Sequence, residues 1–200
     1  MSDPGLWQQI LHAGLGWAVS VFPAAAPGAD GPREFPVDAP ADYASVHHDY
    51  PATDIFADCG SPAVAPVSGL VLEVGRVDRW DPRTDRGRDR GGKFVSLRGR
   101  DGVLYYSSHL ARVERDLDRG STVRAGEPIG RVGRSGSARP TPCHLHFGIS
   151  PVCGAGRDWW IRRGTVPPYR YLRSWERSGR ASPVAEVSGE IARAGCATRP

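Results

Sequence analysis

The segment His144-Leu145-His146-Phe147 alternates two imidazole rings with two large apolar side chains. In a β-strand, successive side chains point to opposite faces, so residues two apart share a face. On such a strand His144 and His146 project side by side, and Leu145 and Phe147 turn the other way. The segment therefore predicts a strand that presents a pair of histidines on one face.

Short apolar runs bounded by glycine, proline and aspartate fill the rest of the central chain. Such runs are typical of strands and turns, and Asp101-Gly102 between two of them is a hairpin signal. No interior stretch shows sustained helical periodicity. The 200 residues allow one ordinary domain with flanks, and we expect that domain to be β-rich. The runs that carry this expectation are 69–74, 94–97, 103–106 and 128–132.

A second group of candidate ligands lies upstream, in the segment from His47 to Asp54. One histidine and one carboxylate from this segment, added to one histidine of the later pair, give three protein ligands. Three is the number expected of a catalytic zinc site, which keeps its fourth position open for water. An isolated His-x-His is more often a pair of surface residues, so the upstream segment carries the argument. Cys143 does not fit as a fourth ligand, because on a strand it faces away from the pair.

At this point the chain resembles the M23 (LytM/lysostaphin-like) zinc metallopeptidases, which cut peptide bonds in bacterial peptidoglycan. Each motif alone is weak, but their order and spacing are specific, and the resemblance runs from about Phe35 to about Pro151. It implies an all-β fold, an antiparallel β-sheet sandwich of the duplicated hybrid motif or LytM type with short helical or irregular flanks. The motifs are 54–57, 60–69, 91–95, His109-Leu110, 123–130, 133–136 and 144–147.

The first metal motif departs from the family pattern of His-x-Gly-x-Asp. Tyr50 stands four residues before Asp54, and the nearest histidine is His48, six residues before it. We interpret this as a two-residue insertion that carries Pro51. His48 keeps even parity with Asp54 on an extended chain, which favours it as the ligand. Pro51 can break that parity, so His47 stays open, and Asp49 is a more distant alternative.

The resemblance implies metal-assisted amide hydrolysis. Zn²⁺ would be held by His48, Asp54 and His146, while His109 and His144 would flank the open position. The flanking pair would orient or deprotonate the water and stabilise the developing oxyanion. The substrate would be a peptidoglycan peptide, cut by a monomeric enzyme. The bond cleaved is not specified by these motifs.

Two other readings compete with the enzyme. The first is a non-catalytic M23-like module that binds the wall or regulates another enzyme; the altered first motif is the argument for it. The second is a biotinyl or lipoyl carrier, which segments 65–69 and 123–130 also resemble. A carrier modifies a lysine at a hairpin tip, but Lys93, the only lysine, opens an apolar strand. A carrier also has no use for the histidines.

The ends of the chain and its cysteines indicate an extracytoplasmic protein. Residues 1–32 form an apolar, signal-like leader or docked segment, without a positive start. At most this leader would give peripheral or N-terminal membrane association. Four cysteines allow three pairings, and we expect Cys59 with Cys143 and Cys153 with Cys196. We expect the peptidase domain over 33–178 and a loose tail over 179–200.

The charge pattern argues against a nucleic-acid partner. The net charge is +4, but arginines alternate with aspartates over 79–90, and no basic-aromatic motif occurs. We expect 79–90 to be an exposed loop. One of Tyr105 and Tyr106 should face the core, and the other should line the groove. The aromatic segment from Trp159 should pack on the domain or line the groove edge.

Overall fold

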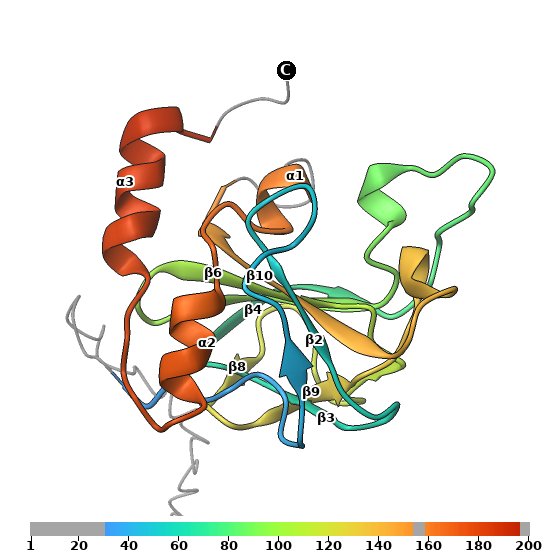
Figure 1. The fold of residues 1–200 in the computed structure, drawn as a ribbon, viewed down its shortest axis with the longest axis horizontal. Coiled ribbons are helices and arrows are strands. Elements are labelled where there is room, and N and C mark those ends of the chain that lie inside the picture. The colour runs from blue at the N-terminus through green and yellow to red at the C-terminus, as the bar shows by residue number, and fades with distance from the viewer. Residues whose placement is uncertain (1–30, 154–158, 197–200) are drawn as a thin grey trace, which may run out of the picture.

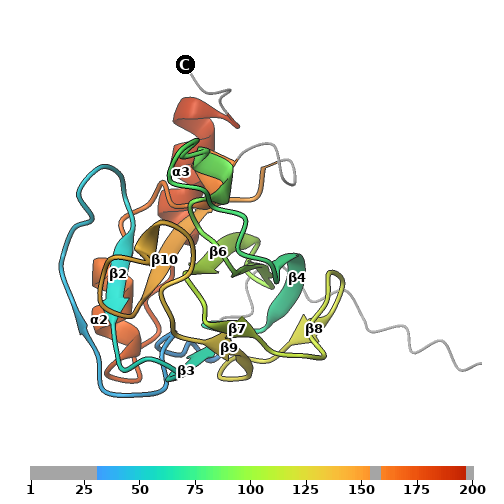
Figure 2. The same ribbon diagram turned by 90° about the vertical axis from the view of Figure 1, so that its right-hand side faces the viewer.

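Two antiparallel sheets make up the body of the protein in the computed structural model, which describes residues 31–153 and 159–196. The larger sheet has the strand order β1-β2-β10-β6-β5-β4-β8, and the smaller has the order β3-β9-β7. Figures 1 and 2 show the small sheet lying against the large one. This confirms the expected antiparallel β-fold. The strands are β1 (Asp42–Tyr43), β2 (Thr53–Phe56), β3 (Pro62–Val64), β4 (Gly69–Gly75), β5 (Phe94–Gly99), β6 (Val103–Ser108), β7 (Arg112–Val113), β8 (Thr122–Val123), β9 (Pro128–Arg131) and β10 (His144–Pro151).

The predicted hairpin joins β5 to β6. Gly102 takes a positive φ of 79°, a conformation that glycine adopts without steric cost, and its N–H donates to the Gly99 carbonyl. The register pairs Leu97 with Tyr105 and Ser96 with Tyr106. Tyr105 packs in the core and Tyr106 lines a cavity on the other face. The expected division between the two tyrosines is confirmed.

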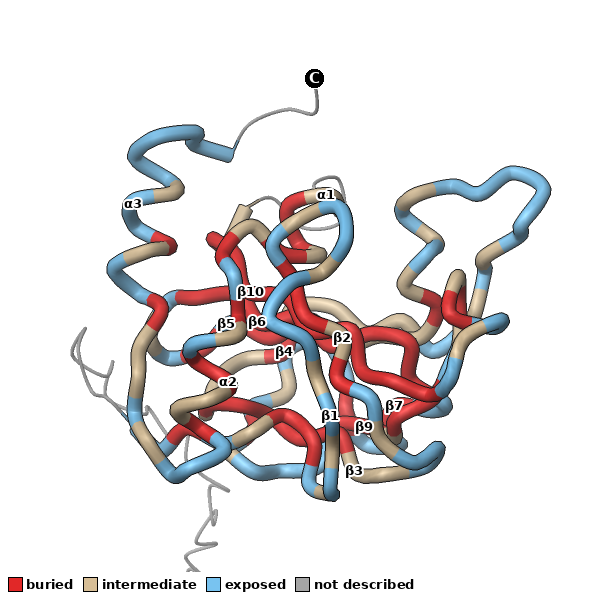
Figure 3. Tube along the Cα trace, viewed as in Figure 1, coloured by how far each residue is buried: buried red, intermediate tan, exposed pale blue. Residues whose placement is uncertain are grey.

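Strand β10 is the centre of the core. Leu145, Phe147 and Ile149 are fully buried and face the small sheet and helix α2, as alternation requires. His144 and His146 lie on the opposite face and are also buried. Figure 3 shows this strand as the middle of the buried region. Two polar rings are thus held on a rigid strand with little freedom to move.

Three α-helices follow β10, and two 3₁₀ turns interrupt earlier loops. The indole of Trp175 packs edge-on against the rings of Tyr105 and Phe147, at 6.2 Å from each, so α2 closes one side of the core. Figure 1 shows α2 and α3 along the same side of the sheets. The helical elements are α1 (Trp159–Arg162), α2 (Tyr169–Trp175), α3 (Val184–Ala194), η1 (Gly87–Asp89) and η2 (Gly136–Ala138).

The expectation of a loose tail after Ser178 does not describe the structure, because Val184–Ala194 forms helix α3. Val184, Val187 and Ile191 recur at helical spacing, and Val187 is buried against the core. The short apolar stripe was too weak to predict a helix. The expected leader falls almost wholly outside the described residues. Among the described residues, none of the helices has the length and apolar character needed to cross a membrane.

Both expected disulfides are present, Cys59–Cys143 and Cys153–Cys196. The first connects the loop after β2 to the residue just before His144, across 84 positions of sequence. The second ties the end of α3 to the segment after β10. The two bonds therefore anchor both ends of the central strand to distant parts of the chain.

We predict that the unreduced, unfolded protein contains no reactive thiol, because all four cysteines are paired. Replacing Cys59 and Cys143 together by serine should lower the free energy of unfolding by about 2–5 kcal/mol, the usual effect of removing a native disulfide. Thiol titration and denaturant unfolding measure the two effects. The Cys153→Ser/Cys196→Ser pair is the matched comparison. Four reactive thiols in the wild-type protein would contradict the assignment.

Candidate metal centre

The register between β2 and β10 builds the core of the site. His146 lies directly opposite Asp54, and His144 lies opposite Phe56. The Nδ1 atom of His146 is 2.9 Å from Oδ1 of Asp54. Directly opposite residues on antiparallel strands bring their side chains together on one face. An imidazole and a carboxylate from segments 92 residues apart are therefore fixed side by side.

His47, rather than His48, completes a three-ligand group. Its Nε2 atom is 3.7 Å from Oδ2 of Asp54, and one donor atom each of His47, Asp54 and His146 lie within 4.8 Å of one another. His48 is exposed on the neighbouring cavity wall. Even spacing from Asp54 would favour His48 only if the chain between them were extended. Residues 48–51, which include Pro51, bend instead, just before strand β2.

The two ring nitrogens of His146 both face acceptors. Nδ1 faces the Asp54 carboxylate, and Nε2 lies 3.0 Å from the carbonyl oxygen of Arg163. If Nε2–H donates to that carbonyl, the Nδ1 lone pair points at the carboxylate. A cation next to Nδ1 and Asp54 relieves this repulsion, and a fixed tautomer is how proteins orient a metal-binding imidazole. The donor set therefore suits a divalent metal held through Nδ1 of His146.

His109 and His144 form a second pair of rings beside these donors. Their centroids are 5.0 Å apart, and His109 is 5.9 Å from the His146 ring. Nδ1 of His109 contacts the Ser135 carbonyl at 2.8 Å, and Nδ1 of His144 contacts the Pro142 carbonyl at 2.9 Å. With both Nδ1 atoms donating to carbonyls, both Nε2 atoms are free to accept protons. The Nε2 atom of His144 lies 3.9 Å from Asp54.

The backbone at His109 is held in a conformation that non-glycine residues rarely adopt, with φ of 64°. Three backbone hydrogen bonds surround this residue and its turn: the His109 N–H donates to Gly91, the Leu110 N–H donates to Lys93, and the Ser135 N–H donates to the His109 carbonyl. Conformations of this kind gather at functional sites. The three hydrogen bonds hold the His109 backbone so that its ring lies next to the His144 ring.

Burial and neighbouring charge set the protonation states. Burial is the main cause that lowers the pKa of His109, to about 3, with His146 and His144 adding to it. Burial likewise lowers the pKa of His47. Burial alone would raise the pKa of Asp54, but the hydrogen bond and charge of His146, with His144 and His47, lower it to about 2. Neutral imidazoles and an ionised carboxylate are the forms that bind a metal.

Asp78 braces the turn that orients His109. Its Oδ2 atom accepts the Gly136 N–H at 2.9 Å and contacts Nη2 of Arg139 at 2.8 Å, so the β4–β5 connection is tied to η2. The Ser135 carbonyl that holds the His109 ring directly precedes η2. Arg139 therefore serves this brace. Oγ1 of Thr141 lies 3.4 Å from Nδ1 of His144.

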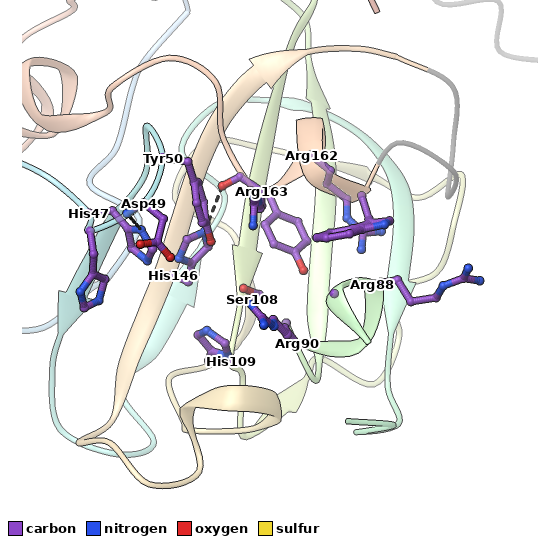
Figure 4. A pocket seen from close by; sticks show the side chains of 15 residues that line it. His47, Asp49, Tyr50, Arg88, Arg90, Ser108, His109, His146, Arg162 and Arg163 are labelled. Atoms are coloured by element: carbon purple, nitrogen blue, oxygen red, sulfur yellow. Dashed lines mark hydrogen bonds between the residues drawn. The ribbon is translucent and has the colours of Figure 1, made fainter. Parts of the chain in front are cut away.

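A cavity opens beside His47 and His146, which both line it (Figure 4). Its lining brings together distant parts of the chain: the His47 loop, the β4–β5 connection, β6 and helix α1. The aromatic segment from Trp159 contributes to it, as expected, and so does the loop over 79–90, which was expected only to be exposed. Sequence reasoning missed its arginines. Those lining it are Arg88, Arg90, Arg162 and Arg163, and its aromatic residues are Tyr50, Tyr106 and Trp159.

Residues 48–156 match the sequence profile of Peptidase family M23. The chain belongs to this family. Among curated relatives, the M23 chain is 32% identical over 130 residues to the L-Ala–D-Glu endopeptidase of Bacillus subtilis strain 168. That match covers 62% of this chain and 35% of the relative, so the M23 chain spans about a third of the relative's length.

Solved structures agree with the M23 fold. The catalytic domain of lysostaphin from Staphylococcus simulans, an antimicrobial peptidase, matches with a TM-score of 0.50 and 23% identity, over 68% of this chain and 94% of that one. A candidate glycyl-glycine endopeptidase LytM from Ruminococcus gnavus matches with a TM-score of 0.56 and 24% identity, over 74% and 62%. At this identity the likeness concerns the fold alone.

The carrier reading gains no support from the M23 chain. Lys93 lies just before β5, and its Nζ atom donates to the Ala111 carbonyl at 2.8 Å, so the lysine is held against the body of the domain. A carrier lysine stands instead at a hairpin tip.

We predict that Asp78→Asn lowers the free energy of unfolding by about 1 kcal/mol near neutral pH, the usual scale of a lost hydrogen bond. Burial alone would raise the Asp78 pKa, but the Gly136 N–H and Arg139 lower it below 3.8. Its stabilising effect is therefore present above the unfolded-state pKa and lost as pH falls through the folded-state pKa. Denaturant unfolding at a series of pH values should show the two proteins converging below about pH 4.

Asp116 offers a matched control, because it is exposed and its carboxylate forms no hydrogen bond or ion pair with any described residue. Asp116→Asn should leave stability unchanged. A stability difference for Asp78→Asn that stays constant from pH 2 to 7 would contradict the role given to its charge.

Proposed function

We propose that the chain is a zinc-dependent endopeptidase that hydrolyses peptide bonds in bacterial peptidoglycan. One observation carries the proposal: His47, Asp54 and His146 converge as three ligands while His109 and His144 stand beside them with Nε2 atoms free. Three ligands with an adjacent proton acceptor are the arrangement of a catalytic rather than a structural zinc site. Membership of the M23 peptidase family supports the same reaction.

The residues fit zinc. Two imidazole nitrogens and one carboxylate oxygen form a donor set that zinc accepts, and no fourth protein ligand closes the group among the described residues. When bound, zinc supplies a Lewis acid that polarises the scissile carbonyl and lowers the pKa of water. Because the Arg163 carbonyl contacts Nε2 of His146, Nδ1 of that ring would be the ligand atom.

The two remaining histidines handle the proton. In their neutral form, with Nδ1–H donating to a backbone carbonyl, His109 and His144 each present Nε2 as an acceptor. One of them takes the proton of the attacking water at Nε2, and its imidazolium then donates to the oxyanion or returns the proton to the leaving amine. Burial lowers the pKa of His109, so its imidazole is neutral and its Nε2 unprotonated at neutral pH.

The residues of the site and the names of the relatives together indicate the class of substrate. Sugar hydrolysis normally needs two carboxylates across the glycosidic bond, whereas this site combines imidazoles with one carboxylate. The curated relative is named for cleavage between L-Ala and D-Glu, and lysostaphin is described as a peptidase. These names support a peptide bond of the wall as the target. Two disulfides fit a protein that acts outside the cytoplasm, and we propose a secreted or cell-envelope monomer.

We predict about one zinc per chain after mild dialysis, because three protein ligands converge. His47→Ala and Asp54→Ala should lose the metal. His48→Ala, the matched neighbour, should keep it, because His48 lies outside the three-ligand group. Metal analysis of each variant makes the comparison. Loss of zinc in His48→Ala with retention in His47→Ala would reverse the ligand assignment.

We predict that digestion of purified wall material releases new amino termini without new reducing ends, and that a chelator stops it. His109→Ala should keep zinc but lose at least about 100-fold in turnover, the usual effect of removing a general base. New reducing ends from the pure protein would contradict the amide mechanism. Bound zinc without any release would favour the non-catalytic wall-binding or regulatory module.

A further inference from the structure

The cavity beside the metal donors is strongly basic. Four arginines line it, and Asp49 is the one carboxylate among its lining residues. Cavities lined by one sign of charge attract and orient a ligand of the opposite sign. The excess positive charge lies next to the position where the scissile bond would be held.

Three of these arginines are already engaged or point elsewhere. Arg162 is buried, with Nη1 2.5 Å from Oε2 of Glu73 and its guanidinium over the Phe94 ring. Arg90 pairs with Asp85 through two of its nitrogens. Arg88 is exposed, and Figure 4 shows its side chain directed away from His146. None of the three has a free guanidinium facing the metal donors.

Arg163 differs from the other three. Its guanidinium lies 3.8 Å from the Tyr50 ring centroid and 5.4 Å from that of Trp159, and no acidic side chain among the described residues forms an ion pair with it. Its Nε atom is buried without a hydrogen-bond partner in that part of the structure. An arginine held flat on an aromatic ring keeps its fork of donors in one orientation.

The backbone of Arg163 holds this residue close to the proposed metal site. The Arg163 carbonyl accepts from Nε2 of His146, so its α-carbon sits one hydrogen bond away from a proposed metal ligand. Figure 4 shows Arg163 and Tyr50 directly beside His146. A group bound by this side chain would belong to a residue next to the scissile bond.

We infer that Arg163 is a specificity residue that binds a free carboxylate of the substrate peptide, adjacent to the bond cleaved. Guanidinium and carboxylate match in charge and geometry and form two parallel hydrogen bonds. The inference rests on the proposed function, since it names the peptides that this peptidase prefers. Wall peptides with a free carboxylate at that position would be cleaved in preference to their amidated forms and to glycine bridges.

Three synthetic stem peptides test the inference on the zinc-loaded full chain: one with all carboxylates free, one amidated at the carboxyl group beside the scissile bond, and one amidated only at the distant C-terminus. We expect amidation beside the bond to lower kcat/KM by about 10- to 100-fold, the scale of a charge-assisted pair. Amidation at the C-terminus should have little effect. Equal kcat/KM for all three peptides would overturn the inference and leave the peptidase function standing.

Variants then assign the effect to one side chain. Arg163→Gln should bring the ratio of kcat/KM for free and amidated peptides close to one, and Arg163→Lys should restore part of it. Arg119→Gln, at an exposed position outside the cavity, should keep the wild-type ratio. Zinc content shows whether the metal centre survives each change. A wild-type ratio in zinc-loaded Arg163→Gln would overturn the assignment, and failure of the wild-type enzyme to cleave any of the three peptides, despite bound zinc, would overturn the proposed function itself.

Discussion

The pairing of His146 with Asp54 across β2 and β10 positions everything else in the site. A slip of one residue in this register would turn both side chains to the opposite face and destroy the ligand group. Several constraints hold the register: Leu145, Phe147 and Ile149 are fully buried on the core face, β6 pairs with the other edge of β10, and Cys143 is cross-linked just before the strand begins. Core packing and site geometry are thus the same constraint, because they occupy opposite faces of one strand.

Two glycines let the rest of the site approach this strand. A Cβ atom on Gly148, two residues after His146, would lie 2.3 Å from the Arg163 carbonyl oxygen, and one on Gly164 would lie 2.2 Å from the Pro51 carbonyl. Real contacts of this kind do not occur, so any larger residue would push the segment after α1 away from β10 or from the His47 loop. The carbonyl that orients His146 and the loop that carries His47 therefore depend on the same close packing.

The β-fold was predictable from sequence, because alternation on a strand fixes which residues share a face. Both disulfides followed from where the cysteines stand, two of them beside the two histidine segments and two of them flanking the tail. The same rule of alternation placed His144 and His146 on one face and separated Tyr105 from Tyr106, whereas Asp54 came from the family resemblance. Alternation did not identify His47, because it does not apply across the bend at 48–51. Pro51 was the residue in the sequence that indicated such a bend. Alternation made no prediction about Arg163. Nothing in the local sequence indicates that this residue, which follows a one-turn helix, contacts a histidine 17 positions earlier in the chain.

The family match covers 48–156, whereas Arg162 and Arg163 follow it and His47 precedes it by one residue. Within the matched region, β2 and β10 carry Asp54, His144 and His146, and His109 directly follows β6. Segments at the two edges of that region complete the candidate metal group and the cavity wall. Chemistry needs fixed atoms, which strands provide, whereas substrate choice depends on surrounding loops that tolerate change. In the proposed enzyme Arg163 joins the two requirements in one residue: its backbone carbonyl contacts His146, a proposed metal ligand, and its side chain would face the substrate. A shift of this segment would therefore alter metal affinity and substrate preference together, while a change of the side chain alone would alter only preference.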